Sequence, residues 1–166
     1  MRTREAVAAD VRRIAEIHVL AWQSGYRGLL PQEVLDALRP AQRIPRWLST
    51  VQRAEWPCRG TLVADDAGDV VGFADLRPAA ADVGEIASFH VLPDRWGSGV
   101  GQAMMAEALR TFRAAGYRSA ALWVLDTNVR ALRFYTKAGW RPDGTSRPDV
   151  VGGQPIRDVR YRLDLS

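Results

Sequence analysis

The stretch that decides the fold is Phe89-His90-Val91-Leu92-Pro93-Asp94-Arg95-Trp96-Gly97-Ser98-Gly99-Val100-Gly101-Gln102. A strand-like run breaks into glycines there and then opens a helix, which is the architecture of an anion-binding loop. Glycines at alternate positions, 97, 99 and 101, let the backbone turn with positive φ and approach a ligand closely. The first N–H groups of the following helix have no intrahelical acceptor, so a diphosphate fits there.

Two common phosphate-binding loops do not match this stretch. A P-loop requires Lys followed by Ser or Thr after its last glycine, whereas Gln102 and Ala103 follow Gly101. The dinucleotide fingerprint requires a glycine where Gln102 stands, and an acidic residue on a second strand about 20 residues later. ATP, GTP and NAD are therefore not the expected ligands.

A second motif lies between residues 126 and 140. It reads Asn128-x-x-Ala131-x-x-Phe134-Tyr135-x-x-x-Gly139-Trp140, with Gly139 as the cap that ends a helix. Together the two motifs resemble those of the GNAT family of N-acetyltransferases, Gln/Arg-x-x-Gly-x-Gly/Ala followed by Asn-x-x-Ala-x-x-Phe-Tyr-x-x-x-Gly-Phe. Two positions depart from the family pattern, because Trp96 replaces the leading Gln or Arg and Trp140 replaces the final Phe.

The resemblance implies an α/β (α+β) GNAT fold, with a central mixed, mostly antiparallel sheet of six to seven strands flanked by about four helices. It also implies that acetyl-CoA binds as the cosubstrate, with Asn128 contacting the pantetheine arm, and that no metal is needed. The cofactor-binding residues that it implies are Phe89, His90, Val91, Gly97, Ser98, Gly99, Val100, Gly101, Gln102 and Asn128.

The resemblance further implies direct attack of an amine on the acetyl thioester, with N–H groups near Val91 polarising the carbonyl. It assigns Glu85 as the base and Tyr135 as the acid that protonates the departing thiolate. A carboxylate is about six pKa units below an alkyl ammonium, so direct transfer to Glu85 is costly, and His90 or a water relay is an alternative. The ordinary pKa of a phenol is only slightly above that of a thiol, so proton transfer from Tyr135 to the thiolate costs only about 2 kcal/mol.

On the acceptor side, the stretch 21–31 contains two glycines and predicts an exposed aromatic loop after the first helix. In the family this region lines the acceptor, which makes Trp22 and Tyr26 candidate substrate contacts; packing between helices is the alternative. His18 lies on the apolar face of the preceding helix and is expected to be a core residue.

The periodicity predicts the remaining elements. The strands expected are 2–7, a hairpin of 60–65 and 70–76, 85–91, 120–125 and two closing strands within 140–165. A first helix is expected to begin at Asp10, and further helices are expected over 32–38, 41–53 despite Pro45, and 102–115. A loop of small residues is expected at 78–84.

Length and composition predict a single domain over residues 1–166, and the resemblance implies that it is an N-acetyltransferase domain. The chain is 47% hydrophobic and 25% charged, and no apolar run reaches the roughly 18 residues that span a bilayer. A signal core is absent, so a cytoplasmic protein without a membrane partner is expected. One cysteine and two histidines leave no Cys/His metal site. The net charge of +4 comes from scattered arginines, which favours weak attraction for coenzyme A over a nucleic-acid partner.

The expected acceptor is the primary amine of a small molecule. A peptide or protein N-terminal acetyltransferase needs the same cofactor loop and remains an alternative, as does a non-catalytic domain that binds coenzyme A as a sensor. Retention of Asn128, Tyr135 and Glu85 favours catalysis. Many family members form dimers, so a homodimer is possible.

Overall fold

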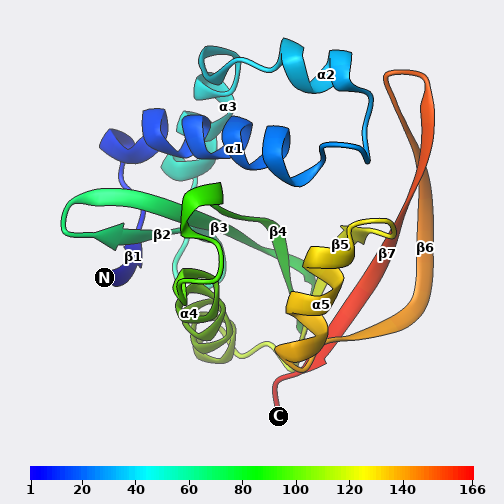
Figure 1. Cartoon of the computed structure of the whole chain (residues 1–166). Coiled ribbons are helices and arrows are strands. Elements are labelled where there is room, and N and C mark those ends of the chain that lie inside the picture. Colours follow the sequence, from blue (N-terminus) through cyan, green and yellow to red (C-terminus); the bar gives the residue numbers. More distant parts are fainter.

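A computed structural model describes all 166 residues as seven strands and five α-helices (Figure 1). The strands are β1 (Arg2–Glu5), β2 (Gly60–Asp66), β3 (Asp69–Ala80), β4 (Val83–Val91), β5 (Ser119–Leu125), β6 (Arg141–Val151) and β7 (Gln154–Asp164). The helices are α1 (Val11–Gly25), α2 (Gln32–Ala37), α3 (Ile44–Gln52), α4 (Val100–Ala114) and α5 (Val129–Lys137). One sheet has the order β1-β2-β3-β4-β5-β7-β6, in which only β4 and β5 pair in parallel. This confirms the expected mixed, mostly antiparallel fold.

Helices cover both faces of the sheet, with α1 and α3 on one face and α4 and α5 on the other (Figure 1). Strand β3 shows why, because its side chains alternate between the two faces. The ring of Phe73 packs against Trp47 of α3 with centroids 4.9 Å apart. A Cβ on the neighbouring Gly72 would instead lie 3.0 Å from the sulfur of Met104 in α4. One core, around Trp47 and Phe73, lies beneath α1 and α3 and also includes Met104 of α4, while the other, around Phe112 and Trp140, lies beneath α4 and α5.

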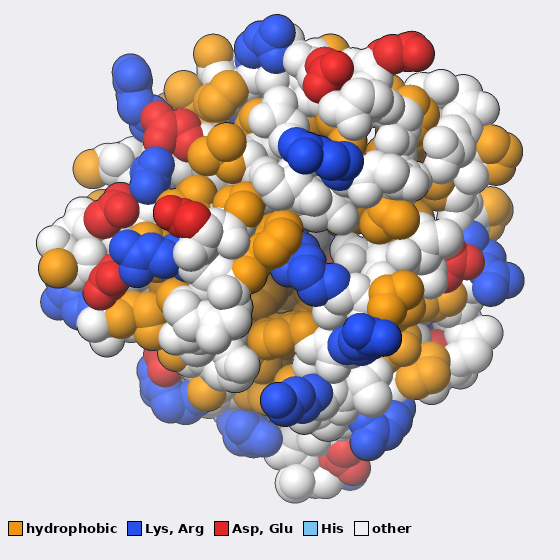
Figure 2. All heavy atoms as spheres, viewed as in Figure 1, with side chains coloured by type: hydrophobic (Ala, Val, Ile, Leu, Met, Phe, Trp, Pro, Cys, Tyr) orange, Lys and Arg blue, Asp and Glu red, His pale blue; other side chains and the backbone are white.

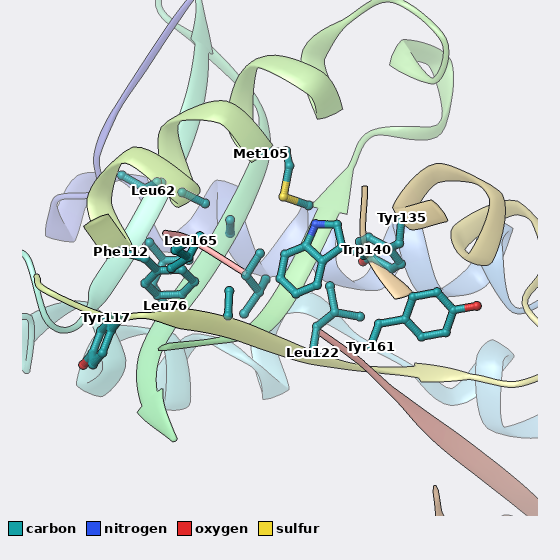
Figure 3. Packing of buried hydrophobic residues seen from close by; sticks show 14 of the residues in the cluster. Leu62, Leu76, Met105, Phe112, Tyr117, Leu122, Tyr135, Trp140, Tyr161 and Leu165 are labelled. Atoms are coloured by element: carbon teal, nitrogen blue, oxygen red, sulfur yellow. The ribbon is translucent and has the colours of Figure 1, made fainter. Parts of the chain in front are cut away.

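The core beneath α4 and α5 closes around Trp140, the residue after the glycine that ends α5. Figure 3 shows its indole beside Tyr135 and Met105. The side chain is fully buried, and its N–H has no hydrogen-bond partner. Where the family pattern has Phe, this chain therefore fills the core with a larger ring.

One expected helix starts later than predicted, and one expected loop was wrong. The helix expected over 41–53 begins at Ile44, after a 3-10 turn at Pro40–Gln42. Pro45 thus occupies the first turn of α3, where its missing N–H costs no intrahelical bond. The expected loop at 78–84 belongs to β3 and β4, because pairing of Pro78 with Gly84 continues their hairpin to a tight turn.

Strand β4 contains a β-bulge at Ala87. Asp75 of β3 pairs with Ser88 and Leu76 pairs with Ile86, so Ala87 has no partner on β3. A bulge inverts the alternation of side chains beyond it. Before Ala87, odd-numbered residues of β4 such as Glu85 face α1, whereas after it even-numbered residues such as His90 face α1.

The effect of the bulge is visible in the directions of Phe89 and His90. Phe89 points to α5, where its ring lies 5.6 Å from that of Phe134. His90 points to α1, where its ring lies 5.5 Å from that of His18. Consecutive residues of one strand thus face the two different helix layers.

The parallel strands β4 and β5 separate just beyond the same point. Their pairing covers only Val83 to Ile86 against Ser119 to Leu122. Beyond Leu122, β5 continues to pair with β7 on its other side. One edge of β4 therefore loses its neighbour and opens a gap in the middle of the sheet.

Substitution of Gly84 should test the tight packing beside this gap. A Cβ on Gly84 would lie 2.6 Å from the ring of Phe112, which is fully buried. We expect Gly84→Ala to lower the free energy of unfolding by about 1–3 kcal/mol, measured by urea denaturation. In a Phe112→Leu background the ring is gone, so the same substitution should cost less. An equal cost in both backgrounds would contradict this packing.

Candidate active site

A cavity of about 500 Å³ opens where β4 and β5 separate. Its walls come from α1, from β4 and the loop after it, from β5 and α5, and from the hairpin of β6 and β7. Figure 2 shows a hollow near the centre of this face, bordered by hydrophobic and by Lys and Arg side chains. The separation of two parallel strands therefore produces the candidate site.

The glycine loop forms one wall at the start of α4. Gly97 and Gly99 have φ of +76° and +94°, conformations that glycine adopts without strain. A Cβ at either position would meet nothing within 4 Å, so the loop surface is open. Helix α4 begins without a side-chain cap, which leaves its first N–H groups without protein acceptors. The loop and helix end are thus suited to an anion.

Gly101 serves a different purpose from the one expected. It lies inside α4 without a positive φ, and a Cβ there would lie 3.1 Å from the ring of Phe134. The expectation that three glycines turn the loop was therefore wrong for Gly101. Its missing side chain instead lets α4 approach α5 closely.

Helix α5 begins and ends as the second motif predicts. The Oδ1 of Asn128 accepts a hydrogen bond from the backbone N–H of Ala131 at 3.2 Å. Gly139, with a φ of +95°, ends the helix. The cap uses only the amide oxygen, so the side-chain NH₂ of Asn128, which lines the cavity, remains free to donate.

Tyr135 lies on the cavity side of α5, one turn after Ala131. Its ring packs edge-on against Phe89, Phe134 and Trp140, with centroids between 5.4 and 6.3 Å away. Burial raises the pKa of its phenol well above the ordinary value of 10, while the nearby Arg130 cation acts in the opposite direction. The hydroxyl thus stays protonated across the physiological range, so it can act as an acid and not as a phenolate base.

Two stacked histidines form the opposite wall. The rings of His18 and His90 lie 5.5 Å apart at 14°. Trp47 donates its indole N–H to Nδ1 of His18 at 3.0 Å, so the proton of that imidazole is on Nε2. Burial lowers the pKa of His18 to about 3 and that of His90 to about 4. Both imidazoles are therefore neutral at physiological pH.

An aromatic pair continues this wall. Trp22 and Tyr26 pack edge-on with centroids 4.9 Å apart, and both line the cavity. The expectation of an exposed loop here was wrong, because α1 continues through Gly25 and places Trp22 on its last turn. Both side chains are partly buried. A regular helix, not a loop, therefore holds Trp22 in the wall.

The predicted site residues divide into two groups. Those that line the cavity are Trp22, Tyr26, Phe89, His90, Val91, Gly97, Gly101, Gln102, Asn128 and Tyr135. Ser98, Gly99 and Val100 do not line it. The Ser98 hydroxyl donates to the carbonyl of Arg95 at 2.6 Å, and Val100 is buried in the core. Their place in the site is therefore limited to backbone groups of the loop.

Glu85 also lies outside the cavity lining. It is on the face of β4 that His90 shares, but its carboxylate accepts from Nε of Arg77 at 2.5 Å. Arg77 is exposed and lies directly opposite on β3. The structure thus brings Tyr135, Asn128 and His90 to one cavity and leaves Glu85 in a cross-strand ion pair.

The sequence did not indicate Arg130 as a site residue, and it predicted only a core position for His18. Arg130 occupies one of the variable positions between Asn128 and Ala131, where the motif gives no signal. The available signal was Trp96, whose departure from the family pattern left that motif position without a polar or basic side chain. His18 is both buried and part of the cavity wall.

No helix in the structure has the length and apolar character needed to cross a membrane. No three His, Cys, Asp or Glu side chains lie close enough together to hold a metal ion.

Comparisons with known proteins agree with this geometry. A model of the Acetyltransferase (GNAT) family matches residues 29–140. The uncharacterised N-acetyltransferase YuaI of Bacillus subtilis is 29% identical over 162 residues, which cover 94% of this chain and 88% of the relative. An uncharacterised N-acetyltransferase of Archaeoglobus fulgidus is 30% identical over 158 residues, covering 92% and 97%. The PaiA N-acetyltransferase of Thermoplasma acidophilum, solved in complex with coenzyme A, superposes with a TM-score of 0.78 at 17% identity over 98% of both chains. The chain therefore belongs to the GNAT family, and the protein is an N-acetyltransferase.

Proposed function

We propose that the protein transfers an acetyl group from acetyl-CoA to a primary amine of a small molecule, by direct attack of the amine on the thioester. One observation carries this proposal: a single cavity joins the glycine loop, Asn128 and Tyr135 to the wall of Trp22 and Tyr26. Groups suited to the donor and to the acceptor thus face one space, as direct transfer requires.

The donor side fits the parts of acetyl-CoA in order. The uncapped first turn of α4 and the loop at Gly97 and Gly99 suit a diphosphate. The NH₂ of Asn128 suits an amide carbonyl of the pantetheine arm. Acetyl-CoA supplies a thioester carbonyl whose oxygen gains negative charge during transfer. N–H groups of β4 near Val91, on the edge that β5 leaves free, are proposed to stabilise that oxygen.

The shape of the acceptor side favours a small molecule. The tip of the β6–β7 hairpin packs onto the segment between α1 and α2, where Gln154 donates to the carbonyl of Leu29 at 2.8 Å. A Cβ on Gly152 would lie 2.5 Å from Val34 of α2, so the two segments are in close contact. We propose that this contact closes the end of the cavity through which a peptide would have to continue. An amine with a compact or flat body fits between the aromatic rings.

His90 is proposed to accept the proton that the amine loses. It lines the cavity, its imidazole is neutral above about pH 5 because burial lowers its pKa to about 4, and no protein group occupies its nitrogens. A nitrogen becomes much more acidic as its lone pair forms the new bond, so a weak base suffices. Glu85 is the rival base, through a relay around its ion pair with Arg77.

Paired variants should separate these two bases. We expect His90→Gln to lower kcat/KM by at least about 10-fold and Glu85→Gln to change it less than about 2-fold. The wild-type pH profile should show no inflection between pH 6 and 7, because His90 does not titrate there. A larger loss in Glu85→Gln would transfer the role to Glu85.

The acceptor class is tested by release of free coenzyme A thiol from acetyl-CoA. The panel consists of polyamines, amino acids, aminoglycosides and short peptides. Turnover with the first three classes supports the proposal, and turnover with peptides alone would replace it by the peptide alternative. Tight binding of acetyl-CoA in calorimetry without turnover on any acceptor would favour the sensor. Absence of binding would overturn the assignment of the glycine loop.

A further inference from the structure

Arg130 occupies a position that the proposed function leaves unexplained. It extends from the first turn of α5 and lines the cavity. Its guanidinium carbon lies 3.6 Å from the centroid of the Trp96 ring. Its Nη2 lies 3.1 Å from the point that a Cβ on Gly25 would occupy. The charged group therefore lies between the glycine loop and the end of α1, where the donor and acceptor halves of the cavity meet.

The guanidinium is held in place from one side only. The indole N–H of Trp96 donates to the carbonyl of Val91 at 2.9 Å, which fixes the ring on which Arg130 stacks. Stacking orients the plane of a guanidinium and leaves its N–H groups at the edge free to donate. None of the five N–H donors of Arg130 has a hydrogen-bond or ion-pair partner in the protein.

Of the other arginines in the wall of the cavity, Arg46 also lacks an ion pair, but its guanidinium carbon lies 5.5 Å from the centroid of the Trp47 ring, and the remaining two behave differently. Arg95 pairs with Asp66 at 2.8 Å, and Arg147 pairs with Asp158 at 3.2 Å. Those two cations are satisfied by the protein itself. Arg130 stacks on Trp96 instead, and its charge is directed to no protein group.

We propose that Arg130 binds an anionic oxygen group of a ligand in the cavity, either a phosphate of acetyl-CoA or a carboxylate on the acceptor. Trp96 stands where the family pattern has Gln or Arg, and Arg130 brings a guanidinium to the face of that same Trp96. The polar group absent from the loop thus returns from a different helix. This inference deepens the proposed function and rests on it.

The first arm of the test measures binding of the donor. Calorimetry compares coenzyme A with pantetheine, which lacks the diphosphate and the nucleotide. We expect Arg130→Gln to weaken coenzyme A binding by about 10-fold or more and to leave pantetheine unchanged, if a phosphate is the partner. Arg133→Gln is the matched control, because it removes the same charge from α5 outside the cavity lining. Trp96→Arg in the Arg130→Gln background should restore the affinity.

The second arm measures the acceptor. Amino acids and their amides are compared as acceptors, at saturating acetyl-CoA. If a carboxylate is the partner, Arg130→Gln should raise KM about 10-fold or more for the acids and leave KM for the amides unchanged. In both arms, Arg130→Lys should retain part of the effect, since it keeps the charge but not the stacked fork.

Equal effects of Arg130→Gln on both members of each pair, or no effect at all, would overturn the inference. Inorganic diphosphate, titrated into the wild type and Arg130→Gln, keeps the test independent of the proposed function. Wild type that binds diphosphate through Arg130 but not coenzyme A would refute the proposed function and leave the inference standing. Thermal melting of each variant confirms that the fold is intact.

Discussion

Tyr135→Phe should lower kcat by about 100-fold or more while leaving the affinity for acetyl-CoA within about 2-fold. The substitution removes only the hydroxyl, so packing of the ring against Phe89 and Trp140 is retained. The lost group is the proposed donor of a proton to the departing thiolate. Because burial raises the pKa of Tyr135, the phenol remains protonated at every pH at which the enzyme is assayed. Thiol release measures kcat, and calorimetry measures affinity.

Tyr161→Phe is the matched control for this result. Tyr161 belongs to the same hydrophobic cluster and is buried, but it comes from β7 and does not line the cavity. Its hydroxyl should be dispensable for turnover. Equal kcat values in wild type and Tyr135→Phe would remove Tyr135 from the mechanism, and equal losses in both variants would indicate a packing effect.

Asp75→Asn should stabilise the protein by up to about 3 kcal/mol at pH 8. Burial raises the pKa of Asp75 from 3.8 to about 6, so the folded state disfavours the charged form. A carboxyl whose pKa is higher in the folded state binds its proton more tightly there, and stability is lost as pH rises through that folded value. The gain from the neutral amide should therefore fall to about half at pH 5 and vanish near pH 3. Asparagine keeps an oxygen that can accept from the Thr61 hydroxyl, which is 3.1 Å away.

Urea denaturation at these three pH values measures the difference in stability between Asp75→Asn and the wild type. Asp82→Asn is the control, since Asp82 is exposed at the turn between β3 and β4 and should show no gain. Comparison of variants is essential because the two histidines act in the opposite direction. Their pKa values are lower in the folded state, so their contribution is lost as pH falls below about 6.5. A pH-independent gain, or none, would contradict the assignment to Asp75.

Local signals in the sequence were enough to predict most elements. The glycines at 97 and 99, the cap at Asn128 and the end of α5 at Gly139 each depend on a few neighbouring residues. The hairpin of β2 and β3 likewise turns at Ala67 and Gly68, both with positive φ. These features follow from backbone chemistry within a turn or two.

Features that depend on register or on tertiary contact could not be predicted in this way. The bulge at Ala87 is defined by how β4 aligns with β3, and the ion pair of Glu85 with Arg77 follows from the same alignment. The stacking of Arg130 on Trp96 joins two residues from different elements. For the same reason, Gly101 was assigned to a turn, although its contact with Phe134 comes from the packing of two helices.

The bulge at Ala87 also bears on how enzymes with this chain's architecture diversify. Beyond it, Phe89 faces the α5 wall of the cavity, which is proposed to bind the donor, while its neighbours Ser88 and His90 face the α1 side, which is proposed to bind the acceptor. A substitution at position 88 therefore affects the wall beside α1 without touching the wall beside α5. Deletion of Ala87 would exchange the two sets at once and leave neither half intact. Along this strand, a substitution therefore affects one wall of the cavity, whereas a change in length affects both.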